Sequence, residues 1–165
     1  YEESLMMPFI VKWPGVTKPG SRNRNLIQNL DYSETFLEMA GAPIPSDMQG
    51  RSLVPLLKGQ NPDEWRKSIY YHYYEYPSVH MVPRHYGIRT QRYKLMHFYQ
   101  FGNEWELYDL KSDPDELTNL YGKPEHAKLQ KRMKNRLAKL QQHYEDNSDI
   151  SEKPDSWKSQ MRAEK

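Results

Sequence analysis

The last long element of the chain constrains the fold most. Apolar side chains recur there at intervals of four, four, three and four residues within a polar stretch: Leu129, Met133, Leu137, Leu140 and Tyr144. This spacing is typical of an amphipathic helix, because residues three and four apart lie on the same helical face. We therefore predict a long helix over about residues 125–145, with an apolar stripe that another element must cover.

Four short runs ahead of this helix have the composition of strands. They are rich in aromatic and branched residues and span residues 69–74, 86–90, 93–99 and 105–109. Gln91-Arg92 and Gly102-Asn103 stand where hairpin turns would fall, so the last three runs are predicted to form an antiparallel meander with the helix across one face. Asp113, Asp115 and Glu116 then break the pattern, and we interpret them as turn acids that cap a helix start.

Residues 1–60 have a different pattern of apolar residues. The segment Met6–Trp13 is almost continuously apolar and ends at a Pro-Gly pair, which predicts a strand buried on both faces, as at the centre of an α/β sheet. The spacing of apolar residues predicts a helix over Tyr32–Ala40, and residues 53–59 predict one or two further helical turns. Since this part lacks sheet neighbours for its strand, we expect marginal stability or exposed apolar surface around Phe9–Val11.

Composition excludes some classes of site. The sequence has no cysteine, which removes disulfides, thiolate metal sites and a cysteine nucleophile from this chain. Its net charge of +2 does not demand a polyanionic partner. No apolar run approaches the roughly eighteen residues of a membrane span. Because the sequence opens on Tyr1, we expect it to be cut from a larger protein, and we expect residues 147–165 to form a polar, extended tail.

Motifs for catalysis are missing as well. The acids fall in turns, there is no HExxH pattern for a metal, and there is no GxSxG elbow for a serine nucleophile. The residues therefore predict no catalytic group and no metal ligand within this chain.

The segment of residues 75–86, EYPSVHMVPRHY, is the best candidate for ligand binding. Aromatic faces, imidazoles and a guanidinium suit a pocket for a sugar with acidic groups, and a loop of this length and composition has no evident packing role. The residues of this segment that fit such a pocket are Glu75, Tyr76, His80, Arg84, His85 and Tyr86. The tyrosines of the preceding strand are interpreted as packing residues.

The predicted C-terminal helix is rich in cations. It carries Lys128, Lys131, Arg132, Lys134, Arg136 and Lys139 without an acid among them. These positions occupy most of the polar circumference, so a solvated face is favoured over nucleic-acid binding. A scaffold or nucleic-acid-binding domain and a stand-alone carbohydrate-binding module without catalysis remain as alternatives for the whole chain.

Four segments together resemble a known family. They are YEESLMMPFIVKWPG, NLIQNLDYSETFLEMAGAPIPSDMQGRSLVPLLKG, HYGIRTQRYKL and ELYDLKSDPDELTNL, in this order. They resemble the C-terminal third of the sulfatases, the formylglycine-dependent enzymes of the alkaline-phosphatase-like superfamily, over roughly residues 1–145. Among these, the chain is most similar to sulfatases that act on sulfated sugars such as glycosaminoglycans or mucin glycans.

The resemblance implies a parent enzyme that hydrolyses a sulfate ester or a sulfamate. A hydrated formylglycine would be the nucleophile, and a divalent cation, usually calcium, would hold the sulfate. The family's Cys/Ser-x-Pro-x-Arg motif is missing here; the nearest lookalike, Ser112 to Glu116, has Glu in the Arg position. The fragment is therefore expected to bind neither cofactor and to be inactive alone, and its parent is expected to be exported.

The resemblance also implies an α+β architecture. Residues 1–60 would supply the terminal strand and helix of the large α/β sulfatase domain, its N-terminal catalytic part being a partner. Residues 65–146 would form a four-stranded antiparallel sheet packed by a long C-terminal helix, followed by the tail at 147–165. The resemblance also implies that side chains of this subdomain reach the rim of the sugar site. The loop before HYGIRT is where they would lie, so the predicted substrate-binding residues are His80, Arg84, His85 and Tyr86.

Overall fold

The computed structural model describes residues 1–76, 81–100 and 102–148. The chain divides into two compact units, Tyr1–Ile69 and Tyr70–Lys165, each with its own cluster of buried hydrophobic side chains. In the described part, no helix is long and apolar enough to cross a membrane.

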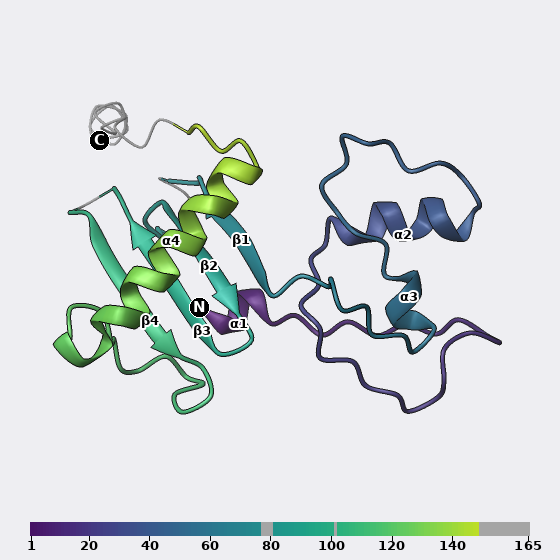
Figure 1. Ribbon diagram of the computed structural model, residues 1–165, viewed down its shortest axis with the longest axis horizontal. Helices are drawn as coiled ribbons and strands as arrows, with labels where there is room; N and C mark the ends of the chain where they lie inside the picture. Colours follow the sequence, from purple (N-terminus) through teal and green to yellow (C-terminus); the bar gives the residue numbers. More distant parts are fainter. Residues whose placement is uncertain (77–80, 101, 149–165) are drawn as a thin grey trace, which may run out of the picture. The chain divides into compact units, whose positions relative to one another are not determined.

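The larger unit is built on a four-stranded sheet in the order β1-β2-β3-β4 (Figure 1). Its strands are β1 (Ser68–Tyr73), β2 (His85–Thr90), β3 (Tyr93–Phe98) and β4 (Glu104–Asp109). The pairs β2–β3 and β3–β4 are antiparallel, and Leu95 of β3 lies opposite Ile88 and Leu107. The predicted strands and meander are confirmed. Alternating apolar residues specify the register of each pair, because a slip by one residue would turn the apolar side chains to the wrong face.

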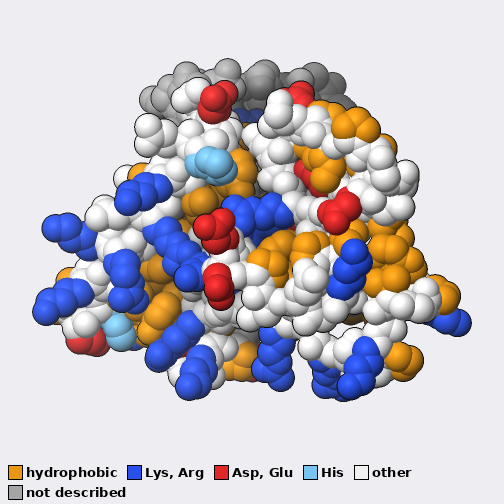
Figure 2. Space-filling model, turned by 45° about the vertical axis from the view of Figure 1, so that its right-hand side comes forward, with side chains coloured by type: hydrophobic (Ala, Val, Ile, Leu, Met, Phe, Trp, Pro, Cys, Tyr) orange, Lys and Arg blue, Asp and Glu red, His pale blue; other side chains and the backbone are white. Residues whose placement is uncertain are grey.

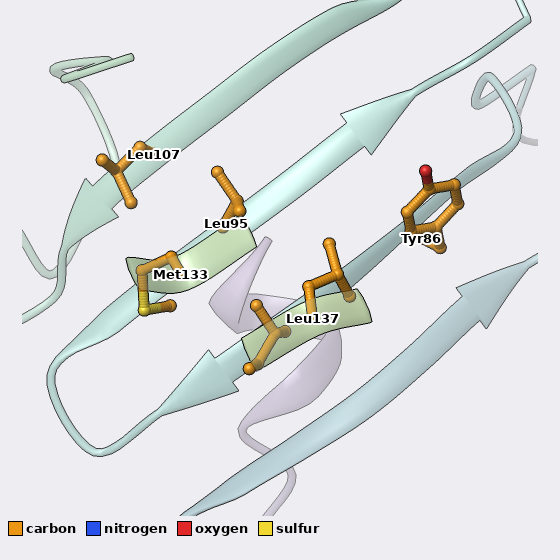
Figure 3. Close-up of a cluster of buried hydrophobic side chains, with 6 residues drawn as sticks. Tyr86, Leu95, Leu107, Met133 and Leu137 are labelled. Carbon is orange, nitrogen blue, oxygen red and sulfur yellow. The ribbon is translucent and has the colours of Figure 1, made fainter. Parts of the chain in front are cut away.

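One helix covers one face of this sheet (Figure 1). A short 3-10 turn, η1 (Pro124–His126), leads into α4 (Ala127–His143). Met133 and Leu137 of α4 pack against inward-facing residues of the sheet (Figure 3). The members of this core that are almost fully buried are Tyr86, Ile88, Leu95, Leu107, Met133 and Leu137. The helix predicted from the apolar stripe is confirmed, and its stripe is the face that contacts the sheet.

The opposite face of the sheet carries the other half of each strand's residues. The ring of Tyr71 packs closely over Gly87 of β2, where a Cβ atom would lie 2.6 Å from the Tyr71 hydroxyl and from the Leu95 carbonyl oxygen. This position therefore has no room for a side chain. On the same face, Lys94 forms a fully buried ion pair with Glu116, at 2.5 Å.

This ion pair corrects the interpretation of the turn acids. Asp113 does act in a turn, because its carboxylate accepts hydrogen bonds from the backbone N–H groups of Leu117 and Thr118, at 3.1 and 2.8 Å. However, no helix begins there. Glu116 turns inward to Lys94, which lies 22 positions earlier in the sequence. Local spacing could not predict a contact between residues this far apart.

The smaller unit has three short helices, α1 (Glu2–Leu5), α2 (Asp31–Met39) and α3 (Val54–Leu57). The helices predicted near residues 32–40 and 53–59 are confirmed. Leu53, Leu56 and Trp65 form its hydrophobic cluster. Hydrogen bonds close the unit: the Trp65 indole N–H donates to the Leu26 carbonyl at 2.9 Å, and the Leu53 N–H donates to the Thr35 hydroxyl at 2.8 Å.

The strand predicted at Met6–Trp13 is wrong for the chain as it folds here. Most of that segment has no regular secondary structure, and its side chains face outward: Ile10 is 92% exposed and Phe9 42% exposed. A strand forms only where backbone N–H and C=O groups find a neighbour, and none of the four strands pairs with this segment. The expected exposed apolar surface is thus present at Phe9 and Ile10.

Candidate functional site

The predicted binding loop leaves the sheet at the end of β1 and re-enters it at β2. Strand alternation sorts the aromatic side chains there onto two faces. Tyr71 and Tyr73 lie on the face that carries His85, whereas Tyr70 and His72 lie on the face that α4 covers. The tyrosine-rich strand therefore serves two clusters with different surroundings.

His85 sits in an aromatic cage. Its ring stacks on Tyr73 with centroids 5.4 Å apart, meets Phe98 at 4.8 Å, and meets Tyr71 edge-on at 5.9 Å. Burial lowers the pKa of His85, so the imidazole is held neutral. Because Nδ1 lies 2.8 Å from the Pro83 carbonyl oxygen, Nδ1 carries the proton and Nε2 is an acceptor.

Two hydrogen bonds fix Arg84, the residue before His85. Its Nη2 donates to the Tyr76 carbonyl oxygen at 3.0 Å, and its backbone N–H donates to Gln100 Oε1 at 2.9 Å. Three buried polar atoms on these residues and their partners have no hydrogen-bond partner: Arg84 Nε, Gln100 Nε2 and the hydroxyl of Tyr73, whose ring stacks on His85. Unpaired buried donors cost free energy, so these atoms would gain hydrogen bonds from ligand oxygen atoms that reached them. Sequence reasoning missed Gln100, whose signal was its place just after β3, across from Arg84.

Tyr86 is placed apart from His85. As the next residue of β2 it points to the other face, where its side chain belongs to the core beneath α4. Its hydroxyl lies 2.7 Å from His97 Nδ1, and His97 Nε2 contacts Asn103 Oδ1. Burial raises the pKa of Tyr86 and lowers that of His97. The structure therefore does not bring Tyr86 together with Arg84 and His85, and His80 lies outside the described residues.

A second polar cluster joins β1 to the residues that follow α4. His72 lies between Asp146 and Tyr99, with Nδ1 2.7 Å from Asp146 Oδ2 and Nε2 2.9 Å from the Tyr99 hydroxyl. The Tyr70 hydroxyl also donates to Asp146, and Tyr74 stacks on His72 with centroids 3.8 Å apart. We call His72, Asp146, Tyr99 and Tyr70 the clasp.

The carboxylate of Asp146 is the main charge within the clasp. Burial alone would raise the pKa of Asp146, but hydrogen bonds from Ser148, Tyr70 and His72 outweigh it and hold this pKa well below its usual range. Burial, with the neighbouring Asp146, raises the pKa of Tyr70, and burial raises that of Tyr99. Both phenols therefore stay protonated and donate hydrogen bonds. Asp146 was missed from the sequence because it lies just past the predicted helix, among tail-like polar residues.

Neither cluster has the composition of a metal site. Across residues 1–76, 81–100 and 102–148, no three His, Asp or Glu side chains gather closely enough to hold a metal ion. The sequence also contains no Cys/Ser-x-Pro-x-Arg motif whose first residue could mature to formylglycine. The residues present thus do not fit calcium or the family's nucleophile.

Comparison with known proteins identifies the family of the chain. Residues 1–143 match the profile of the family described as N-sulphoglucosamine sulphohydrolase, C-terminal. The chain belongs to this family. It is a sulfatase C-terminal domain, as the four sequence segments indicated, and the predicted fold class is confirmed by the sheet and its helix.

Relatives of this domain include characterised sugar sulfatases. The chain is 51% identical over 149 residues to an N-acetylglucosamine-6-O-sulfatase of Bacteroides thetaiotaomicron, covering 89% of this chain and 27% of the relative. It is 30% identical over 159 residues to an ulvan-active sulfatase of Formosa agariphila, covering 78% and 31%.

A solved structure shows the same fold. It superposes with a TM-score of 0.83 at 48% identity, over 87% of this chain and 30% of that one, and was solved with its substrate D-glucosamine-2-N,6-O-disulfate. The sulfatase C-terminal domain described here thus spans less than a third of each of these relatives.

Proposed function

We propose that the parent protein hydrolyses sulfate esters of sulfated glycans, and that this chain supplies substrate-recognition residues and no nucleophile. The observation that carries the proposal is that Arg84, Gln100 and Tyr73 each keep a buried polar atom without a hydrogen-bond partner, and that Gln100 contacts Arg84 while Tyr73 stacks on the neutral imidazole of His85. Membership of the sulfatase C-terminal family supports it, as does a relative solved with a disulfated glucosamine.

The chemistry of these groups fits a sulfated sugar. The guanidinium of Arg84 can donate to sulfate or hydroxyl oxygens, and Gln100 Nε2 can donate to a hydroxyl. His85 Nε2 can accept a hydrogen bond from a hydroxyl group, while the rings of Tyr73 and Phe98 offer apolar faces to a sugar ring. We narrow the direct contacts to Arg84, His85 and Gln100, since the Tyr86 hydroxyl is already engaged by His97. His80 stays a prediction.

The bond-breaking step belongs to the parent enzyme. Calcium would neutralise charge on the sulfate oxygens, and formylglycine would supply the attacking oxygen. In this proposal the residues of this chain bind and orient the sugar only.

The test compares two substrates of the intact parent enzyme. We expect Arg84→Met and His85→Phe to lower kcat/KM for a sulfated glucosamine by about ten- to a hundredfold, as for a lost hydrogen bond to a charged group. Turnover of a small aryl sulfate should change little, since it lacks the sugar. Arg92→Gln, which removes an exposed guanidinium from the turn at the other end of the strands, is the matched control. Equal losses on both substrates would refute recognition by Arg84 and His85.

A further inference from the structure

The outer face of α4 carries a stripe of cations that the sheet does not use. Lys128, Lys131, Arg132, Arg136 and Lys139 line an open groove of about 630 Å³ together with Asn135. Their spacing of three and four residues puts them on one side of the helix. We call these five side chains the cationic stripe. Figure 2 shows Lys and Arg side chains crowded at the left of the view, with few acidic ones among them.

This arrangement differs from the even distribution predicted from the sequence. Lys134, which was counted with the others, turns to the opposite side, where its ammonium lies 4.0 Å from the Trp105 ring centroid and 2.6 Å from the Tyr121 hydroxyl. The remaining cations form one row from Lys128 to Lys139, which is about 17 Å long at 1.5 Å of rise per residue.

Among the residues that the structure describes, the stripe residues have no carboxylate partner, whereas three other cations of the chain do. Arg66, Arg92 and Lys94 each pair with a carboxylate, whereas in the described part no carboxylate forms an ion pair with any stripe residue. The helix itself, Ala127–His143, contains no acid.

Such a row is unfavourable for the helix alone. Like charges three and four residues apart repel, and Lys128 lies in the first turn, where the helix dipole disfavours a cation. Burial lowers the pKa of Arg136, and the neighbouring Arg132 lowers it further. Repulsion within the stripe does not stabilise the fold. A bound polyanion would offset it, because its negative charges would lie between the cations.

We propose that the cationic stripe is an exosite for a sulfated polysaccharide chain. It would bind several sulfate groups of the polymer at once, outside the site where the sulfate ester is cleaved. The choice of a sulfated glycan over another polyanion rests on the proposed function, while the cationic stripe itself rests on the geometry of α4. The net charge of only +2 means that this attraction is local, within about 8–10 Å at physiological salt.

The test measures binding of dextran sulfate, which the enzyme need not cleave, to the intact parent protein. We expect the triple variant Lys131→Gln, Arg132→Gln and Lys139→Gln to bind about tenfold more weakly, because each exposed contact contributes a fraction of a kcal/mol. The wild-type affinity should fall steeply with added salt. Lys18→Gln, Lys58→Gln and Lys111→Gln, which remove the same charge from exposed positions elsewhere, should bind as the wild type does.

Two further comparisons make the result decisive. Lys131→Arg with Lys139→Arg should retain binding, which separates loss of charge from misfolding. Single-stranded DNA of equal charge should bind more weakly than dextran sulfate; tighter binding of DNA would overturn the choice of ligand. Equal affinity of both triple variants would overturn the exosite. Because no turnover is measured, a failure here is distinct from a failure of the sulfatase proposal.

Discussion

Asp31 and Arg66 form a two-pronged ion pair in the interior of the smaller unit. One arm joins Arg66 Nη2 to Asp31 Oδ1 at 2.6 Å, and the other joins Nη1 to Oδ2. Asp31 is 0% exposed. Its carboxylate also accepts hydrogen bonds from the backbone N–H groups of Gln28 and Arg51, at 2.7 and 2.9 Å. One carboxylate at the start of α2 thus ties together three segments that are distant in the sequence.

Removing one partner of this pair should strongly destabilise the smaller unit. We expect Arg66→Met to lower the free energy of unfolding by about 3–5 kcal/mol, because it leaves a buried carboxylate without its counter-charge. Urea unfolding followed by tryptophan fluorescence measures this directly, since Trp65 lies beside Arg66 in the sequence. Arg92→Gln, which breaks a pair whose guanidinium is half exposed, should shift the midpoint only slightly. Similar midpoints for the two variants would contradict this account.

The clasp predicts a particular pH dependence of stability. The pKa of Asp146 is lower in the folded chain than its ordinary value of 3.8, so the unfolded state takes up the proton more readily. The stabilisation is therefore fully present above about pH 4 and is lost as the pH falls towards the folded-state pKa.

Asp146→Asn should remove this contribution. We expect it to lower stability at pH 7 by about 1.5–3 kcal/mol, as for hydrogen bonds to a charged group, and to flatten the loss of stability below pH 4. Thermal melts between pH 2 and pH 7 give both quantities. Asp47→Asn, at an exposed position, should leave the curve unchanged. A variant at position 146 with the wild-type pH profile would show that the clasp does not stabilise the fold.

Exposed apolar side chains of the smaller unit predict self-association of the isolated 165 residues. Met6, Met7, Ile10 and Phe36 are 67–92% exposed, which is unusual for a soluble surface when such residues are grouped. We expect concentration-dependent association in sedimentation velocity, reduced by Ile10→Asp with Phe36→Asp. Leu117→Asp is the control, since Leu117 is an equally exposed leucine of the larger unit, at 83%. A monomeric wild-type chain at high concentration would rule this out.

The spacing of apolar residues and the residue types in turns were enough to predict most helices and strands. The stripe from Leu129 to Leu140 required a helix, and runs such as residues 93–99 between short turns required hairpins, because these signals depend on neighbours within a few residues. The same reasoning failed at Met6–Trp13, where strand formation depends on a partner strand that none of the described strands provides.

For the candidate site, the sequence by itself determined its place and its inventory: the loop between β1 and β2, with Arg84 and His85 at its end. Only the tertiary structure decided that Gln100 joins Arg84, that His97 engages the Tyr86 hydroxyl beneath α4, and that Asp146 joins His72. The physical reason is that local spacing fixes backbone conformation, whereas burial, hydrogen bonding and charge pairing depend on residues that folding brings together from 11 to 74 positions apart.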